Sequence, residues 1–492
     1  MITKEQALYK AEQQFSRLKE LIEKASDRDW RIDEFERETF AQLLDLGFHL
    51  LRAFIAEQGN GDEGERVEHR GKTVRRLPQQ HERRYVSIFG PLDIRRFVYG
   101  TREGQAIEHV PLDARLGLPA GEISYLLEDW LERMCVKEAF RESVDSLVEL
   151  LGVRARVSLE TAEKHSHAMA EHAASFRAAQ APPPPEEEGE LLVATSDAKG
   201  VPMVRPADPE APTPRMGHRR RKGEKANKKQ MAYAGAIYTI DCFPRTADDI
   251  VNELLRKQRA KDRPRPQHKH VWAEMSHPGD GPQENMPLHG PSYLFAGLAV
   301  ECHARDPDRA KKLICLLDGE RQLWDLQQEW LPRAVGILDI FHVSERLWTA
   351  AHCFHAEGSE PAGLFVERYL RMLLEGKVDS VIRSWRQLLA TRRLTGAKRQ
   401  RLQAAITYYQ NNHQHMRYDK YLAAGYPIGS GVAEGACRHL VKDRLERTGM
   451  RWTLDGARTM LHLRALYLNG DWNDFIEHRI TREQNTLYAQ AA

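Results

Sequence analysis

The spacing of apolar residues predicts a helical N-terminal segment followed by a β-hairpin. Residues 3–57 have a helical pattern, and the apolar positions of the second half gather on one side. Residues 59–66 form a polar break. Residues 84–99 then alternate apolar and polar positions around the pair 90–91, Gly-Pro, which is typical of two antiparallel strands joined by a turn.

Two further helices are predicted at residues 139–151 and 159–172. The connection between them ends at Ser158, a residue type that often caps a helix by accepting a backbone hydrogen bond. Two helices joined by a short turn fit a helix-turn-helix element that binds DNA, and they equally fit an ordinary pair of packed helices. The pattern leaves both interpretations open.

A Pro- and Glu-rich stretch at residues 181–190 marks the clearest domain boundary. It holds four consecutive prolines, 182–185, followed by three glutamates, 186–188. Proline restricts the backbone and the glutamates favour water, so this stretch is expected to be a stiff, solvated linker.

Beyond the linker, strands first follow one another and then alternate with helices, the order that a mixed sheet flanked by helices requires. The expected strands lie near residue 191, near residue 201, and at 231–241, 312–317 and 335–339. The expected helices lie at 247–257, 292–304 and 321–330, and a wholly helical region covers 342–422.

Two of these strands lead to an acidic residue. The stretch 191–204 rises as an apolar run to Asp197, turns near Gly200 and resumes, which predicts a hairpin with the acid at the end of its first strand. The apolar run 312–317 is followed by Asp318 and a glycine. A carboxylate at the end of a buried strand is difficult to explain by packing, because an unpaired buried charge is costly.

A third acid lies on a late helix. The segment from Tyr426 begins as a Gly/Pro/Ser turn and continues as a helix that carries Glu434, with Arg438 and Lys442 four and eight positions further on. Residues at this spacing share one helical face, so taken alone the segment is a surface helix with ion pairs. Together with Asp197 and Asp318, Glu434 completes a candidate site for Mg²⁺ or Mn²⁺, which prefer oxygen ligands.

Other acids and a small group of His and Cys residues compete with this site. Asp241 and Asp339 also end predicted strands, so position alone does not exclude them. Glu320 lies two residues after Asp318 and is expected to support it or the following helix. Asp443 is nine positions from Glu434, too far along a regular helix to share its site. Separately, a zinc site is an alternative for four neighbouring residues: His342, His352, Cys353 and His355.

The order and wording of these segments resemble the ISKra-type insertion-sequence transposases, a bacterial group related to Mutator-like elements, whose catalytic domain is ribonuclease H-like. The resembling passages are 196–202, 317–321, 339–342 and 428–452, within a match over about 85–466. By this resemblance the DDE triad that binds metal is Asp197, Asp318 and Glu434. Ala198 is a departure, since Gly is more usual there, and Asp339 with His342 resembles the Cys/Asp-x-x-His pair of Mutator-like transposases.

The resemblance implies an α/β fold with a ribonuclease H-like mixed sheet flanked by helices, an all-helical insertion before the last catalytic helix, and a mostly helical DNA-binding region at the N-terminus. The expected regions are 1–80 (helical), 81–180 (hairpin plus helix-turn-helix-like region), 181–190 (linker), 191–344 (catalytic, first part), 345–424 (helical insertion) and 425–492 (last catalytic helix and tail).

The activity that the resemblance implies is Mg²⁺-dependent cleavage at the 3′ end of the element, followed by attack of that 3′-hydroxyl on target DNA. Two Mg²⁺ ions, for which Mn²⁺ can substitute, would lie about 3.5–4 Å apart and hold the attacking and leaving oxygens. The partners are terminal inverted repeats and target DNA, on which the protein is expected to form a homo-oligomer. A non-catalytic DNA-binding regulator and a structure-selective nuclease are the alternatives.

Charge and composition restrict where DNA can bind. The 492 residues carry 73 Lys and Arg against 71 Asp and Glu, so DNA contact depends on local clusters. One cluster lies at 218–229 and a second at 256–270. The residues expected to contact phosphates are Lys199, Arg219, Arg220, Arg221, Lys222, Arg438 and Lys442. Six scattered cysteines without a C-x-x-C pair, and the lack of an apolar signal or membrane segment, fit a cytoplasmic, nucleoid-associated protein.

Overall fold

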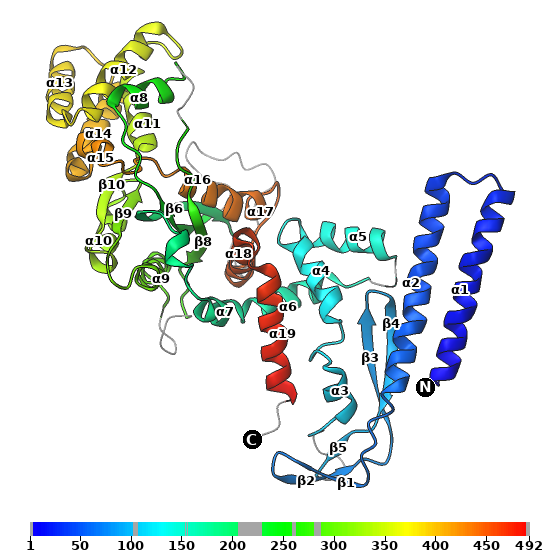
Figure 1. The fold of residues 1–492 in the computed structure, drawn as a ribbon. Helices are drawn as coiled ribbons and strands as arrows, with labels where there is room; N and C mark the ends of the chain where they lie inside the picture. The colour runs from blue at the N-terminus through cyan, green and yellow to red at the C-terminus, as the bar shows by residue number, and fades with distance from the viewer. Residues whose placement is uncertain are drawn as a thin grey trace, which may run out of the picture. The chain divides into compact units, whose positions relative to one another are not determined.

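A computed structural model describes residues 3–101, 107–152, 154, 156–204, 229–257, 262–279 and 287–488. The chain forms two compact units (Figure 1), which we call the N-terminal unit, Met1–Ala178 with Gly470–Ala492, and the sheet unit, Ala179–Asn469. The division falls next to the expected linker. Residues 470–492, which the sequence analysis grouped with the catalytic region, belong to the N-terminal unit instead.

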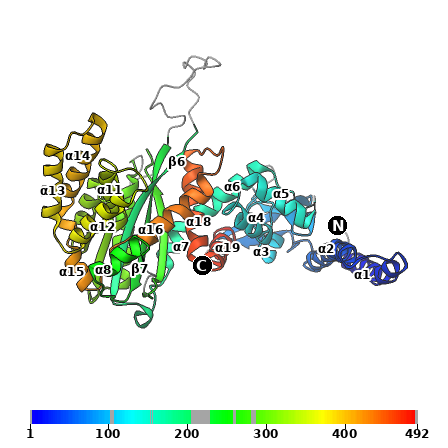
Figure 2. The same cartoon turned by 90° about the horizontal axis from the view of Figure 1, so that it is seen from above.

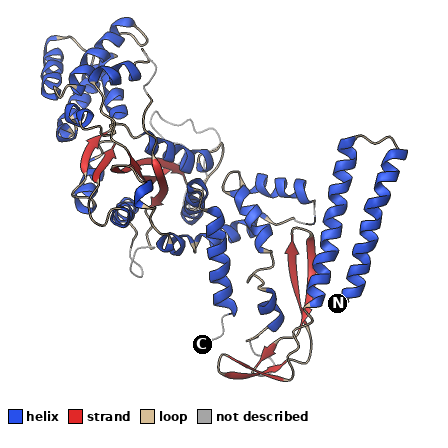
Figure 3. Cartoon of the chain, viewed as in Figure 1, coloured by secondary structure: helices blue, strands red, loops and turns tan. Residues whose placement is uncertain are grey.

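The N-terminal unit is mainly helical (Figure 3). Its helices are α1 (Lys4–Asp27), α2 (Ile32–Glu57), α3 (Pro111–Leu116), α4 (Tyr125–Cys135), α5 (Phe140–Leu151), α6 (Leu159–Ala170), α7 (Ala173–Ala179) and α19 (Trp472–Tyr488). A capping box at Thr3 and Gln6 begins α1, and α1 and α2 form a long hairpin. The predicted helices α5 and α6 are confirmed, and Ser158 caps α6 by accepting from the Thr161 N–H.

Five short strands complete the N-terminal unit: β1 (Arg66–His69), β2 (Lys72–Arg76), β3 (His81–Ser87), β4 (Gly90–Arg96) and β5 (Tyr99–Gly100). The antiparallel pair β3–β4 is the predicted hairpin, and Gly90, with φ +119°, permits its tight turn. The sheet of β1, β2 and β5 was not predicted. Among the residues of β1 and β2 only Val74 is buried, so charged side chains hide the strand pattern.

The sheet unit contains a five-stranded mixed sheet in its described residues. Its strands are β6 (Leu191–Pro202), β7 (Lys229–Ile240), β8 (Gln267–Met275), β9 (Lys312–Leu317) and β10 (Val335–Leu338). They lie side by side in the order β10-β9-β6-β7-β8. β6, β9 and β10 are parallel, whereas β7 is antiparallel to both β6 and β8.

Helices flank this sheet, as Figure 2 shows. The helices of the sheet unit are α8 (Ala247–Leu254), α9 (Gly290–Arg305), α10 (Arg321–Trp330), α11 (Ile340–Ala351), α12 (Glu360–Leu374), α13 (Val378–Thr391), α14 (Gly396–Asn411), α15 (Tyr418–Ala423), α16 (Gly431–Ala436), the π-helix η4 (Cys437–Lys442), α17 (Asp443–Leu445) and α18 (Leu454–Asn469). The predicted helical region between β10 and the Glu434 helix is confirmed as α11–α15.

Two strand predictions were wrong. β6 does not turn at Gly200 but continues to Pro202, because all twelve of its residues pair with β7, from Leu191 opposite Ile240 to Pro202 opposite Lys229. The strand β8 was not predicted: the second basic run, 256–270, was assigned to a loop, but its last four residues begin β8, whose last five residues are buried. Its first residues are exposed and basic, so the sequence pattern indicated a loop.

The linker was expected to be solvated, but Gly189 and the side chain of Glu188 are buried. Glu188 has a buried side chain that accepts a 2.6 Å hydrogen bond from Arg305 Nε of α9. Because the Arg305 side chain is also buried, this ion pair fixes the start of the sheet unit to α9. No helix in the described part of the chain is both long enough and apolar enough to cross a membrane.

Candidate metal and nucleic-acid site

Three neighbouring parallel strands carry an aspartate to the same edge of the sheet. Asp197 lies within β6, Asp318 directly follows β9, and Asp339 directly follows β10. The register pairs Thr195 with Leu316 in one ladder and Leu317 with Leu338 in the next. The three carboxylates therefore leave adjacent strands at corresponding positions.

The strand topology excludes Asp241 as a ligand of the candidate metal site, although its position after a predicted strand had made it a competitor. It follows β7, which is antiparallel to β6, and Ile240 lies opposite Leu191 at the start of β6. Asp241 is therefore at the opposite edge of the sheet from Asp197.

The third predicted acid, Glu434, is brought to this edge by two connections. The Ile340 N–H donates to the Ile428 carbonyl at 2.9 Å, and the carboxylate of Asp339 accepts from the N–H of Ser430 at 3.1 Å and from its hydroxyl. Both contacts hold the turn before α16 against the end of β10. Glu434 lies on the first turn of α16.

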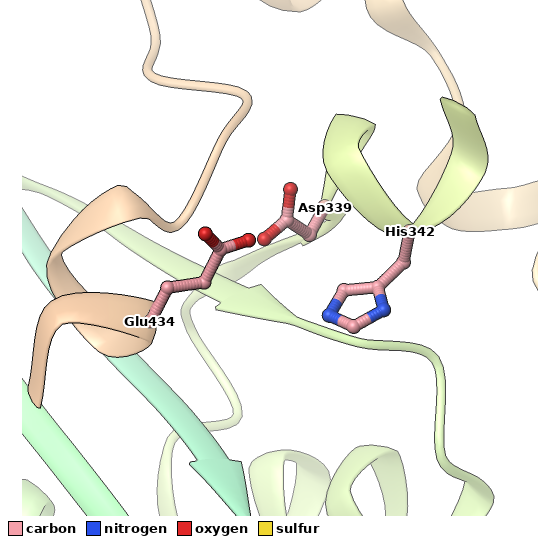
Figure 4. Close-up of side chains that lie close together, drawn as sticks. All are labelled: Asp339, His342 and Glu434. Carbon is pink, nitrogen blue, oxygen red and sulfur yellow. The ribbon is translucent and has the colours of Figure 1, made fainter. Parts of the chain in front are cut away.

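The closest cluster of potential metal ligands combines Glu434 with the Asp339–His342 pair (Figure 4). One ligand atom from each of the three side chains lies within 4.8 Å of the others, and no other such group occurs among the described residues. Asp197 and Asp318 are not in this group, so the sequence-predicted triad shares Glu434 with it but is not itself so tightly gathered.

Asp197 has its own contacts to the helix that carries Glu434. Its Oδ1 accepts from the Ala198 N–H at 2.7 Å, and its carboxylate is hydrogen-bonded to the thiol of Cys437 at the start of η4. Asp318 Oδ1 accepts from the Glu320 N–H at 2.9 Å. Its backbone carbonyl accepts from the Tyr408 hydroxyl at 2.6 Å, which links the strand end to the helical insertion.

Burial and mutual repulsion both act against charge at this edge. Burial raises the pKa of the Asp197 carboxyl, and the charge of Asp318 acts in the same direction. Burial likewise raises the pKa of Glu434, with added repulsion from Asp339 and Asp197. The pKa of Asp339 is also raised by burial, although its hydrogen bonds from Ser430 oppose that change. A bound cation would relieve these penalties.

Basic residues border the acids. A depression of about 630 Å³ is lined by Asp197, Lys199, Glu434, Cys437, Arg438, Lys442 and Asp443. The three predicted phosphate-contacting residues of the described chain therefore share one depression with two of the predicted metal ligands. Asp443 was expected to be too distant, but it lines the same depression and lies 2.9 Å from His439 Nδ1.

Two further predictions have different outcomes. Arg219, Arg220, Arg221 and Lys222 lie outside the described residues. The four residues of the zinc alternative do not form a ligand cluster among the described residues. Instead, His342 faces Asp339 and Glu434, while the Cys353 thiol donates to the Thr349 carbonyl at 3.3 Å.

Sequence reasoning missed the roles of Ser430 and Cys437. Ser430 lies in a Gly-Ser-Gly turn, where small residues are expected because they allow a sharp bend, so the sequence shows no sign of a specific contact. Cys437 occupies what looks like an ordinary apolar position of a helix. Asp339 and His342 were noted as a pair, but their proximity to Glu434 depends on contacts between distant segments. Comparison of the sequence with protein-family models and with curated proteins found no match.

Proposed function

We propose that this protein is a DDE transposase with a ribonuclease H-like catalytic domain, which cleaves DNA at the ends of an insertion sequence and joins the freed 3′ end to target DNA. The observation that carries the proposal is the shared sheet edge. Asp197 lies on the first strand of the sheet in chain order and Asp318 follows the fourth. These are the strands from which the metal-binding acids leave in the transposases that the sequence resembles. Glu434 lies beside Asp197 in a depression bordered by three cations.

The donor set fits Mg²⁺ or Mn²⁺. Asp197, Asp318 and Glu434 offer carboxylate oxygens, which suit hard divalent ions. The pKa values of Asp197 and Glu434 are raised by burial and by repulsion between the acids, and a cation between them would relieve that repulsion. When bound, such ions would polarise the scissile phosphate and favour the deprotonated form of the attacking hydroxyl. His342 beside Glu434 adds a nitrogen ligand, which Mn²⁺ accepts more readily than Mg²⁺.

The surrounding residues orient and hold the reacting groups. Asp339 accepts hydrogen bonds from the Phe341 N–H and from Ser430, so it positions the turn that presents Glu434. Lys199, Arg438 and Lys442 supply positive charge for the phosphates on either side of the cleaved bond. Within the π-helix η4, Arg438 and Lys442 both lie on the side that faces Asp197.

The N-terminal unit supplies a candidate DNA reader. Its helices α4, α5 and α6 pack around a common apolar core that includes Leu131, Leu147 and Ala162. A short connection between two packed helices is the geometry of a helix-turn-helix element. In the proposal this element binds the terminal inverted repeats, while the sheet unit contacts the cleavage site and the target DNA.

The test is cleavage of labelled DNA that carries the repeats flanking the element in its genome, with Mg²⁺ present. Asp197→Asn, Asp318→Asn and Glu434→Gln are each expected to abolish cleavage and to leave DNA binding in gel shifts within about twofold of wild type. Asp241→Asn is the matched control, because Asp241 lies at the opposite edge of the sheet and its variant should cleave normally.

Two outcomes would contradict the proposal. Wild-type cleavage by any of the three variants removes that residue from the metal site. Cleavage without joining of the 3′-hydroxyl to a second duplex favours the nuclease alternative, and DNA binding without any cleavage favours the regulator.

A further inference from the structure

The α1–α2 hairpin of the N-terminal unit exposes an unusual number of large apolar side chains. Seven of them are between 38% and 59% exposed. They are Leu8, Phe15 and Ile22 on α1, and Phe40, Leu43, Leu50 and Phe54 on α2. Exposed apolar side chains scattered over a surface need no explanation, but a continuous set on one structural element does.

On α1 these residues form a stripe with a seven-residue repeat. Leu8, Phe15 and Ile22 are spaced by seven, and each directly follows a buried residue of the seam that faces α2: Ala7, Gln14 and Leu21. A step of one residue turns about 100° around a helix, so the exposed stripe lies next to the buried seam rather than opposite to it.

The same relationship holds on α2. Phe54 directly follows the buried Ala53, and Leu43 and Leu50 directly follow Gln42 and His49, whose side chains have buried polar atoms. The Gln42 carbonyl also accepts from Gln14 of α1, which places it in the seam between the helices. The exposed stripe of α2 is therefore displaced from its seam by one residue, in the same sense as on α1.

This displacement puts both stripes on one side of the hairpin. The two helices run in opposite directions, as the ion pair between Lys4 and Glu57 at their distant sequence ends requires. Viewed along one axis, an equal step forward in sequence turns clockwise on one helix and anticlockwise on the other. Both stripes therefore face the same way and form one surface, which we call the hairpin face.

The rest of the N-terminal unit uses a different side of α2. Phe48, Leu51 and Ile55 pack against Leu92 and Ile94 of the β3–β4 hairpin. With that contact in place, the seven apolar side chains of the hairpin face remain between 38% and 59% exposed.

We propose that the hairpin face is a dimerisation surface for a second copy of this chain. Its exposed positions on α2, 40, 43, 50 and 54, are three, seven and four residues apart, a spacing found along the seam between two interlocking helices. Gly47, between them, packs against the Phe89 ring. A second copy offers the identical stripes, and a twofold axis would match each stripe with its counterpart and close the assembly.

Size and charge favour this partner over DNA or a lipid surface. Because α1 has 24 residues, the hairpin face is about 36 Å long, and two adjacent helices make it about 20 Å wide. Its area is therefore roughly 700 Å² per copy, similar to the area of roughly 800 Å² that each partner buries in a stable complex. α1 has five basic and five acidic residues and α2 two and six, which gives the two helices a combined net charge of −4. An acidic element is repelled by phosphates and by anionic lipids.

Sedimentation equilibrium of the full chain tests this inference, which does not depend on the proposed function. The wild type is expected to form a dimer, and the pair Phe15→Glu with Leu43→Glu should weaken dimerisation at least tenfold. The pair Leu150→Glu with Leu364→Glu is the matched control, because both leucines are more than half exposed and lie outside the hairpin. It should leave the dimer unchanged.

Circular dichroism checks that each variant keeps its helices. If the glutamate pair loses helicity, the milder pair Phe15→Ser with Leu43→Ser replaces it, and the same weakening is expected. A wild type that stays monomeric at every concentration reached would overturn the inference. So would a dimer that persists in both hairpin-face pairs, or one that the control pair weakens equally.

Discussion

The carboxylate of Asp339 binds the turn at Ser430, 91 residues further along the chain, through two donors of the same residue. The backbone N–H of Ser430 donates at 3.1 Å and its hydroxyl donates to the same oxygen, while the other carboxylate oxygen accepts from the Phe341 N–H at 2.8 Å. One buried acid therefore joins the end of β10, the start of α11 and the turn that leads to Glu434. Its geometry favours a role in positioning Glu434.

The first prediction concerns Ser430→Ala. Removing the hydroxyl leaves a buried carboxylate with one donor fewer, which should lower the free energy of unfolding by about 1–3 kcal/mol. In the proposed function, displacement of Glu434 should lower the cleavage rate without changing DNA affinity. Denaturant unfolding, cleavage kinetics and gel shifts measure the three effects.

Ser380→Ala is the control for that variant, since the Ser380 hydroxyl accepts one exposed hydrogen bond from Arg383. It should change neither stability nor cleavage. If Ser430→Ala lowered DNA affinity as much as cleavage, the serine would belong to the DNA contact and not to the positioning of Glu434.

The second prediction concerns the pH dependence of the sheet edge without metal. The pKa values of Asp197 and Glu434 are raised in the folded chain, so above the ordinary carboxyl range the folded state binds more protons than the unfolded chain. Their contribution to stability is full below the unfolded pKa and is lost as the pH rises through the folded pKa. Asp197→Asn and Glu434→Gln should flatten this decline.

Denaturant unfolding in EDTA, from about pH 4 to 7, measures the effect. Added Mg²⁺ should stabilise the wild type at the upper end of this range and stabilise each variant less, because binding to the folded state shifts the unfolding equilibrium. An equal Mg²⁺ effect on wild type and on both variants would place the ion elsewhere.

The third prediction concerns a buried ion pair in the N-terminal unit. Both Arg479 terminal nitrogens of α19 donate to the Glu128 carboxylate of α4, at 2.5 and 3.0 Å, and both side chains are buried. Burial acts to raise the pKa of Glu128, but the hydrogen bond from His165 and the charge of Arg479 outweigh it and hold the pKa below its ordinary value. Glu128 therefore stabilises the fold above the unfolded pKa, and that contribution is lost as the pH falls through the folded pKa.

Arg479→Met should leave Glu128 without its main cation and cost about 3–5 kcal/mol. It should also move the acid-unfolding transition to higher pH. Arg482→Met on the exposed side of α19 is the control and should leave the transition in place. An unchanged acid transition in Arg479→Met would mean that the pair does not control the pH response of this unit.

Local pattern was enough to predict most elements of the sheet unit. The strand at 312–317 and the helix at 321–330 have the predicted bounds because one is a continuous apolar run and the other a clear helical repeat between turn residues. β6 was split at Gly200 because glycine usually ends a strand. In the structure, its partner β7 supplies hydrogen bonds along the whole length of β6.

Only those residues of the candidate site that follow a recognisable apolar strand could be predicted from the sequence. Asp197 and Asp318 follow apolar runs, so their position in sequence indicates the sheet edge. The direction of a strand within its sheet cannot be read from its local sequence. The position of Asp241 at the opposite edge from Asp197 therefore became clear only from the antiparallel pairing of β7 with β6. The link from Asp339 to Ser430 spans the whole helical insertion, and no local pattern could have indicated it.

The last prediction concerns the cations of the depression. In the proposed function, Lys199, Arg438 and Lys442, which lie beside the acids, contact phosphates, and phosphate contacts carry no base information. Replacing all three with Gln should weaken binding to terminal and random duplexes by a similar factor. It should also reduce the slope of log affinity against log salt by roughly 0.9 for each lost contact.

The matched control replaces three exposed cations around the α13–α14 connection, Arg392, Arg393 and Lys398, with Gln. It removes the same charge from a surface outside the depression, so the slope should remain near that of the wild type. A separate variant of Arg219, Arg220, Arg221 and Lys222 tests the predicted basic loop in the same assay. Equal slopes for the depression variant and the control would show that net charge alone governs binding, whereas a loss confined to terminal sequences would make the depression a reader of bases.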